Sequence, residues 1–254
     1  MAFTQSNTKR NWSSMLETWA QPPSPTEQER CDRAISAIAK AISNSPQLKD
    51  RNIRTFVQGS YANGTNGRQD SDVDVCVMCA DTFFYDLPLG KTPQSIGSSP
   101  VQYTYPQYKN DIHSALAAQF KSHNFTRGKK AFDIHENSYR VDADAVACFE
   151  YRHYFHNYYG HLMCHSGTAL VPDKESHFIT NFPQQQHDNE MAKDATTSQR
   201  FKPLVRIVKR LRNEMEENSY SVAKPIPSYL IECLAWNWDS YHYNAQSTYS
   251  GSYT

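Results

Sequence analysis

The sequence predicts an α/β fold of two lobes, in which a sheet with a long N-terminal helix precedes a smaller helical lobe. Two observations support this prediction. Strand-like runs alternate with helical patterns in the first two thirds of the chain, and beyond residue 200 only helical spacing recurs. We therefore expect a sheet-bearing core at residues 1–180, a helical lobe at 181–238 and an unpacked tail at 239–254, where aliphatic residues are scarce.

The long N-terminal helix is expected to begin near Thr26. Thr26 and Glu29 have the spacing of a capping box, in which two side chains satisfy backbone N–H groups at the start of a helix. Apolar residues then recur at helical spacing and should pack under the sheet: Cys31, Ala34, Ile35, Ile38 and Ile42. The helix leads into an expected strand at residues 53–57.

The most informative segment follows that strand, in the run QGSYANGTNGRQDSDVDVCVM. Gly59 and Ser60 are followed by Asp72 and Asp74, and Asp74 stands within a β-branched run that is typical of a covered strand. Residues i and i+2 of a strand point to the same face, so the two carboxylates should converge. Neighbouring carboxylates repel each other unless a cation bridges them.

This arrangement suits phosphoryl transfer. Carboxylate oxygens are good ligands for Mg²⁺ with a triphosphate as co-ligand, glycine lets the backbone approach phosphate closely, and the Ser60 hydroxyl can donate to it. The alternative is a solvated, Asp-rich turn ahead of a strand. Asp72 and Asp74 alone would favour that alternative, whereas Gly59-Ser60 at this distance, with an apolar strand behind, favours the metal site.

A third carboxylate is available in a later strand-like segment, YRVDADAVACFE at residues 139–150. Asp142 and Asp144 share one face of this expected strand. Either residue can complete the metal site, and the spacing alone does not choose between them.

Two polar segments are expected to be loops. Residues 90–106 are rich in Gly, Ser, Pro and Tyr, and an apolar helical pattern follows near residues 112–120. Residues 165–197 are polar, and we expect them to be irregular and to rim the site. Asn181 and His187 are candidates there for contact with a nucleotide base, although most such residues are simply solvated.

The helical lobe is expected to contain a basic amphipathic helix at residues 200–215. Leu204, Val208, Leu211 and Met215 recur at helical spacing and predict its buried stripe. Six Lys or Arg and no acidic residue lie between residues 200 and 212, and Lys202, Arg206, Lys209 and Arg210 should take the other faces. Such a cationic helix is suited to meeting a triphosphate. A second apolar helix should follow near Ser228.

Composition excludes several classes of protein. The 254 residues carry 26 basic and 26 acidic side chains, and a large nucleic-acid footprint normally requires a net basic domain, so long nucleic acid is not expected as an obligatory partner. The first residues lack a signal-peptide core, and no window approaches the roughly 18 apolar residues of a membrane span. The six cysteines are scattered and suit reduced thiols. We expect a cytoplasmic protein with no membrane partner.

The run from Gly59 to Val75 resembles the signature of the DNA polymerase β-like nucleotidyltransferases, and most closely that of the CD-NTases, the bacterial relatives of cyclic GMP-AMP synthase. The resemblance covers about residues 25–238 and implies a polymerase β-like core with a mixed sheet. It favours Asp144 over Asp142, because Asp144-Ala-Val-Ala-Cys-Phe matches the third-carboxylate strand of that family. It also implies that Lys209, Ser228 and Tyr229 contact the donor nucleotide, through its phosphates and base.

The family implies a nucleotidyltransferase that uses Mg²⁺, or Mn²⁺, held by Asp72, Asp74 and Asp144. Its substrates would be nucleoside triphosphates, and its product a cyclic di- or trinucleotide that signals to a separate effector in antiphage defence. Alternatives are a transferase that modifies a protein, a small molecule or an RNA end, or an inactive nucleotide-sensing partner. A regulatory protein partner is left open. By this resemblance we would expect the chain to be C-terminally shortened, because the family usually continues with further helices.

Overall fold

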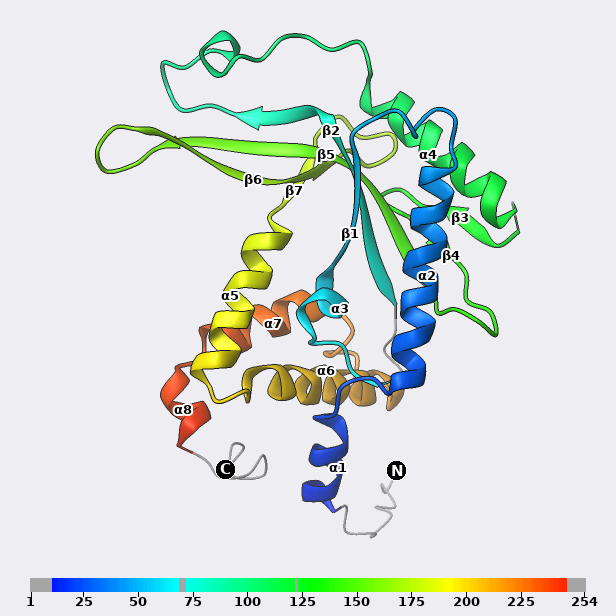
Figure 1. Ribbon diagram of the computed structural model, residues 1–254. Helices are drawn as coiled ribbons and strands as arrows, with labels where there is room; N and C mark the ends of the chain where they lie inside the picture. The colour runs from blue at the N-terminus through cyan, green and yellow to red at the C-terminus, as the bar shows by residue number, and fades with distance from the viewer. Residues whose placement is uncertain (1–10, 69–71, 122, 246–254) are drawn as a thin grey trace. The chain divides into compact units, whose positions relative to one another are not determined.

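The computed structural model describes residues 11–68, 72–121 and 123–245, and it divides into two units (Figure 1). The sheet unit comprises Ser24–Asn63 and Ser71–Asp188. The helical unit comprises Met1–Pro23, Gly64–Asp70 and Asn189–Thr254. The short segment that follows Asn63 therefore belongs with the helices, although it interrupts the sheet unit in sequence.

The sheet unit contains seven strands and several helices. The strands are β1 (Ile53–Gln58), β2 (Val73–Asp86), β3 (Phe125–Arg127), β4 (Phe132–Ile134), β5 (Ala143–His156), β6 (Leu162–Leu170) and β7 (Ile179–Asn181). The helices are α2 (Pro25–Ser43), α3 (Gly59–Asn63), a 3₁₀ turn (Pro93–Ile96), α4 (Tyr105–Phe120) and the start of α5 (Pro183–Thr196).

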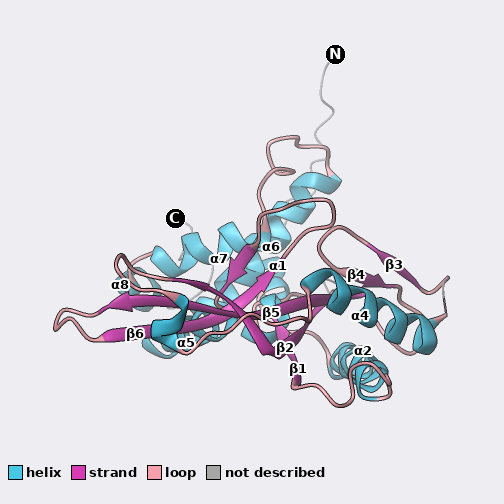
Figure 2. Cartoon of the chain, turned by 90° about the horizontal axis from the view of Figure 1, so that it is seen from above, coloured by secondary structure: helices cyan, strands magenta, loops and turns pink. Residues whose placement is uncertain are grey.

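The sheet is mixed, as the family resemblance predicts. Its strands follow the order β1-β2-β5-β4-β3, with β2 and β5 parallel and the other pairs antiparallel (Figure 2). The far half of β5 pairs with β6, which pairs in turn with β7. The two longest strands, β2 and β5, therefore lie side by side at the centre of the sheet.

Helix α2 forms where the sequence predicts it, but its capping box is different. Ser24 and Glu27 provide the reciprocal hydrogen bonds, and Pro25 takes the first helical position. Proline there lacks only an N–H that would have no helical partner, so it starts the helix at no cost. The predicted Thr26–Glu29 box is therefore wrong by two residues.

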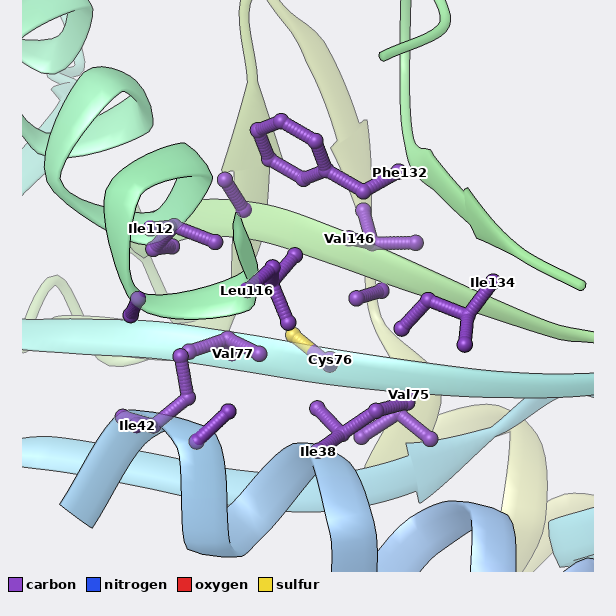
Figure 3. Packing of buried hydrophobic residues seen from close by; sticks show 14 of the residues in the cluster. Ile38, Ile42, Val75, Cys76, Val77, Ile112, Leu116, Phe132, Ile134 and Val146 are labelled. Atoms are coloured by element: carbon purple, nitrogen blue, oxygen red, sulfur yellow. The ribbon is translucent and has the colours of Figure 1, made fainter. Parts of the chain in front are cut away.

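The core lies between the sheet and the helices α2 and α4. Ile38 and Ile42 of α2 lie next to Val75 and Val77 of β2, and Leu116 of α4 packs above the same strand (Figure 3). Two tyrosines of α4 add hydrogen bonds inside this core: Tyr105 donates to the carbonyl of Ala147 and Tyr108 to that of Val77. These hydrogen bonds tie α4 to the two central strands.

The segment from His165 to Thr197 is ordered rather than irregular, which corrects the prediction. It contains the end of β6, β7 and the 14-residue helix α5. Residues of β6 alternate in polarity weakly, and α5 begins with a run of glutamines, so neither shows clear hydrophobic periodicity. The pairing of β6 with β5 supplies the order that local sequence does not indicate.

The helical unit contains α1 (Trp12–Trp19), the rest of α5, α6 (Phe201–Glu217), α7 (Ser228–Asn237) and α8 (Ser240–Asn244). Its core joins α6, α7 and α8 through a small cluster: Phe201, Leu204, Val205, Ala235 and Tyr243. The sequence predicts an unpacked tail from residue 239, but Tyr243 of α8 is buried and donates to the carbonyl of Ala235. Residues 246–254 lie outside the described part.

The buried face of α6 matches the predicted stripe only in part. Leu204 is buried and Val208 packs against the same cluster, but Leu211 is exposed. Arg206 and Lys209 are buried, although they are expected on solvated faces. Both cations have oxygen partners that compensate for their burial, and a sequence pattern does not reveal such partners. None of the helices in the described ranges is both long and apolar enough to cross a membrane.

Candidate active site

Asp74 and Asp144 are direct partners across the parallel strands β2 and β5. Asp72 lies one residue before β2, and the neighbouring Val73 N–H donates to the carbonyl of Asp142 at 3.3 Å. The parallel register therefore brings the two Asp-x-Asp pairs together, as the sequence predicts from the shared face of each pair.

These carboxylates lie on the sheet face opposite the one covered by α2 and α4. Val73, Val75 and Val77 are fully buried against the helices, so the alternating Asp74 points away from them. Asp74 and Asp144 are both half-buried. The site therefore rests on a rigid, packed strand pair with its polar groups on the open side.

A further carboxylate, Asp133 of β4, is the register partner of Asp144 on the other side. Sequence reasoning did not single out Asp133 or His135. The alternation Phe132-Asp133-Ile134-His135 is a strand signal that could have found them, since the apolar members are buried and the polar members take the opposite face. Asp74, Asp144 and Asp133 thus form one row across three strands.

The electrostatics of this row favour a cation. Burial raises the pKa of Asp144, and the nearby carboxylates of Asp133, Asp72 and Asp142 raise it further. A divalent cation would remove this repulsion and restore the charged form. The donor set consists of carboxylate oxygens, which Mg²⁺ prefers, so Asp72, Asp74 and Asp144 fit the proposed metal.

Asp142 has a different environment from Asp144. Its Oδ1 accepts a hydrogen bond of 2.6 Å from the backbone N–H of Glu136. Asp142, Asp133 and His135 each place one ligand atom within 4.8 Å of the others. Asp142 is therefore tied to the β4 side of the row, which agrees with the choice of Asp144 as the partner of Asp74.

Gly59 lies directly against the carboxylate of Asp74. Its φ is +66°, a conformation that L side chains rarely adopt, and an added Cβ would lie 2.5 Å from Oδ2 of Asp74. The glycine therefore leaves room for the carboxylate itself. Ser60 follows in α3, half-buried and next to this contact.

A cavity of about 520 Å³ continues along the same face of the sheet. Gln58, the register partner of Asp74, lines this cavity, and Glu150 and Thr168 line it as well. His187 of α5 also contributes to its wall, and its Nδ1 lies 3.3 Å from Oδ1 of Asn63. Asn181, the other candidate for contact with a base, lies on β7 opposite Thr168. A cavity with these polar groups has the size and chemistry to hold a nucleoside.

The three residues predicted to contact the donor nucleotide through its phosphates and base, Lys209, Ser228 and Tyr229, lie in the helical unit. Tyr229 is 61% exposed, so its ring is not part of the core. Ser228 is the first residue of α7, and its Oγ accepts a hydrogen bond of 3.0 Å from Arg212. Pro227 is the N-cap residue of this helix. Arg212 was not among the predicted site residues.

Lys209 is in a surprising position for a phosphate ligand. Its side chain is 2% exposed and forms an ion pair with Glu232, which is 4% exposed. Its Nζ also lies 3.3 Å from the carbonyl of Thr65. The ammonium group is therefore enclosed within the helical unit.

Comparison with known proteins gives two matching family models. Residues 188–254 match the cGAS/DncV-like nucleotidyltransferase C-terminal helical domain, and residues 36–118 match the nucleotidyltransferase domain. The second match contains Gly59, Ser60, Asp72 and Asp74, and the first contains Lys209, Ser228 and Tyr229. Asp144 lies between the two matches and in neither of them.

Individual relatives agree with these matches. The chain is 42% identical over 229 residues to a cyclic dipyrimidine nucleotide synthase, CdnE, of Legionella pneumophila, covering 89% of this chain and 76% of the relative. It is 31% identical to the cyclic GMP-AMP synthase CdnE03 of Staphylococcus schleiferi, covering 90% of this chain and 78% of that protein. The structure of the c-UMP-AMP synthase CdnE of Rhodothermus marinus, with Apcpp and Upnpp, matches at a TM-score of 0.80 and 27% identity over 94% of this chain and 79% of that one.

Proposed function

Because the chain belongs to the family of cGAS/DncV-like nucleotidyltransferases, we propose that it joins nucleoside triphosphates into a cyclic di- or trinucleotide and releases pyrophosphate. The observation that carries the proposal is the register pairing of Asp74 with Asp144, with Asp72 near enough to raise the pKa of Asp144. That arrangement gathers three carboxylates at the end of a packed strand pair, where a metal–triphosphate complex requires them.

In the proposed reaction, an acceptor ribose hydroxyl attacks the donor α-phosphate. A bond forms from that hydroxyl oxygen to the α-phosphorus, the bond from the α-phosphorus to the oxygen that bridges to the β-phosphate breaks, the hydroxyl proton passes to solvent, and pyrophosphate departs. Mg²⁺ held by Asp72, Asp74 and Asp144 would supply Lewis-acid stabilisation of the charge that develops on these oxygens. A second transfer of the same kind would close the ring.

The residues of this chain would bind and orient the two nucleotides. The cavity beside Asp74 suits the acceptor nucleoside, with Glu150, Thr168 and His187 available for hydrogen bonds to its base. The exposed ring of Tyr229 and the hydroxyl of Ser228 suit the donor nucleotide. Lys209, which the family resemblance assigns to the donor phosphates, is enclosed by its ion pair with Glu232 in this structure.

We further propose that the product contains pyrimidines and acts as a second messenger. Two relatives, at 42% and 38% identity, are cyclic dipyrimidine nucleotide synthases. A cyclic dinucleotide suits a diffusible signal to a separate effector, in antiphage defence as the family implies.

Product analysis tests the cyclic product and its base composition. The protein is incubated with Mg²⁺ and each single or paired nucleoside triphosphate, one labelled at the α-phosphate, and the mixture is treated with phosphatase. A small, phosphatase-resistant product from UTP, CTP or both supports the proposal. Label that stays with protein or RNA would instead identify a transferase that modifies a macromolecule.

A further inference from the structure

Arg212 of α6 reaches the start of α7 within the helical unit, and its side chain is only 16% exposed. Each of its three guanidinium nitrogens donates a hydrogen bond. Nη1 donates to the carbonyl of Ile226 at 2.6 Å, Nη2 to Oγ of Ser228 at 3.0 Å, and Nε to Oδ1 of Asn213 at 2.8 Å. Arginine is seldom this well enclosed, and these partners compensate for its burial.

The two Nη contacts fall on either side of Pro227, the N-cap residue of α7. Proline has no side-chain oxygen that could cap a helix. The guanidinium is planar and its donors keep a fixed spacing, so simultaneous contact with Ile226 and Ser228 sets the path of the chain through the cap. Arg212 therefore fixes the first residue of α7 in the absence of a capping side chain at Pro227.

The direction of the hydrogen bond between Arg212 and Ser228 determines what the hydroxyl can do next. An arginine side chain carries donors and no acceptor, so Oγ of Ser228 accepts. Within the described part of the chain, this is the one hydrogen bond that the Ser228 hydroxyl makes. Its proton is therefore left for an acceptor on a ligand, and the bond from Arg212 polarises the O–H group and strengthens that donation.

The surroundings of Ser228 favour an anionic acceptor. Ser228 is half-buried and the neighbouring Tyr229 is 61% exposed, so a ligand can reach this end of α7. The N-terminus of this ten-residue helix and the guanidinium behind the hydroxyl both place positive charge there. A phosphate oxygen accepts a hydrogen bond from such a group more strongly than a neutral carbonyl does.

The alternative role for Arg212 is direct contact with phosphate. All three of its nitrogens already have partners, at 2.6 to 3.0 Å, and a phosphate would have to replace one of them. The side chain is also largely enclosed. The contacts therefore favour an action of Arg212 through Ser228.

We propose that Arg212 is a positioning residue for the donor nucleoside triphosphate, which holds the Ser228 hydroxyl so that its proton points to a phosphate oxygen. This inference rests on the proposed function, because Ser228 is assigned there to the donor nucleotide. It adds a residue to which neither the sequence pattern nor the family resemblance gives a role.

Binding of the α,β-methylene analogues of ATP and UTP, measured by calorimetry with Mg²⁺, tests this role without turnover. Arg212→Met and Ser228→Ala should each weaken binding about tenfold, the order of effect of one hydrogen bond to a charged group. The double variant should bind no more than about threefold more weakly than either single variant, because both changes remove the same contact. A combined loss of about 100-fold would show that Arg212 acts independently of Ser228 and overturn the proposal.

A disturbed helix start would give a different pattern from a misdirected hydroxyl. Tyr229→Ala removes the ring of the next residue and leaves the Ser228 hydroxyl in place. Its effect on binding should multiply with that of Arg212→Met to within about twofold. Coupling of Arg212 to Tyr229 that is as strong as its coupling to Ser228 would identify a purely structural role and contradict the proposal.

Arg212→Lys guards against a folding defect. It keeps the positive charge, but one ammonium group cannot reproduce the planar fork that contacts the Ile226 carbonyl and Ser228 together. The melting temperature should stay within about 2 °C of the wild type, while binding of the analogues weakens at least about fivefold. Wild-type affinity in Arg212→Lys would show that charge alone suffices and overturn the proposal.

The control variant is Arg33→Met, which removes an exposed ion pair with Glu29 on α2 and should leave the affinity unchanged. Product synthesis separates this inference from the proposed function. Unchanged affinity in Arg212→Met, in a wild type that makes the cyclic product, sinks the inference alone. A loss of affinity that is coupled to Ser228, in a wild type that makes no cyclic product, sinks the proposed function alone.

Discussion

Asp74 and Asp144 are partners in the parallel register of β2 and β5, although 70 residues separate them in sequence. Parallel pairing orients both strands in the same direction, so each Asp-x-Asp pair ends up at the same end of the sheet. The site is therefore a consequence of strand register, and its precision comes from the buried valines and alanines that fix the register.

Substitution of Gly59 by alanine should strongly reduce activity. The added Cβ would lie 2.5 Å from Oδ2 of Asp74 and must displace that carboxylate. We expect a loss of about 100-fold in kcat, since a displacement of about 1 Å has that order of effect. Steady-state kinetics would measure the loss.

The control for this variant is Gly90→Ala. Gly90 also has a positive φ, of +84°, but no atom lies within 4 Å of an added Cβ. Both variants carry a similar backbone strain of about 1–2 kcal/mol, so only the contact with Asp74 distinguishes them. Equal activity of the two variants would contradict the proposed contact.

Asparagine variants should separate the roles of Asp142 and Asp144. Asp144→Asn removes a charge from the proposed metal site, and we expect kcat to fall about 1,000-fold or more. Asp142→Asn retains an oxygen that can accept from the Glu136 N–H, so a loss of less than about tenfold is expected. Turnover measured over a Mg²⁺ titration decides the assignment, and the reverse order of losses would make Asp142 the third ligand.

The raised pKa of Asp144 predicts an effect on the pH profile. Burial and then Asp133 contribute to the rise, and a raised pKa means that a proton competes with metal at higher pH than for an ordinary carboxyl group. Asp133→Asn removes one repelling charge, lowers the pKa of Asp144, and should move the acid limb of kcat/KM to lower pH. A shift to higher pH, or none, would contradict the electrostatic coupling.

Asp173 should contribute to stability in a pH-dependent way. Its hydrogen bond from Arg127 lowers its pKa to about 2 from an ordinary 3.8, and the buried Lys109 adds a second contact. A lowered folded-state pKa contributes stability above about pH 4, which is lost as pH falls towards 2. Asp173→Asn should therefore cost about 2 kcal/mol at neutral pH, a ceiling because the carboxylate is partly solvated.

Thermal unfolding across pH checks this expectation. The difference in melting temperature between wild type and Asp173→Asn should be several degrees at pH 7 and should close between pH 4 and 2. Glu29→Gln, which removes an exposed pair with Arg33, is the control and should show little difference at any pH. A difference that persists at pH 2 would contradict the assignment.

The sequence predicts correctly those features of the fold that depend on local residue pattern and on spacing along the chain. The β-branched run at Asp74, the strand at Asp144 and the family resemblance led to the mixed sheet and to the enzyme class. The roles of the individual site residues remain predictions. Asp133 lies in the same row as Asp74 and Asp144 because β4 pairs with β5 in a register that puts Asp133 opposite Asp144. That register had to be known before Asp133 could be recognised as a neighbour of the site.

The failures have physical causes of the same kind. Arg206 and Lys209 look like solvated cations on a helical wheel, and only the tertiary structure shows the carbonyls and the carboxylate that compensate for their burial. Helix α8 is short and poor in aliphatic residues, yet Tyr243 anchors it through burial and one hydrogen bond. Helical periodicity cannot reveal either contact.

The central claim is that Asp72, Asp74 and Asp144 catalyse nucleotidyl transfer between nucleoside triphosphates. The most direct test incubates the wild type and Asp74→Asn with all four α-labelled triphosphates and Mg²⁺ or Mn²⁺, followed by phosphatase and chromatography. A small phosphatase-resistant product from the wild type, at least 1,000-fold reduced in a folded Asp74→Asn variant, is the predicted result. Equal synthesis by the two proteins would contradict the claim.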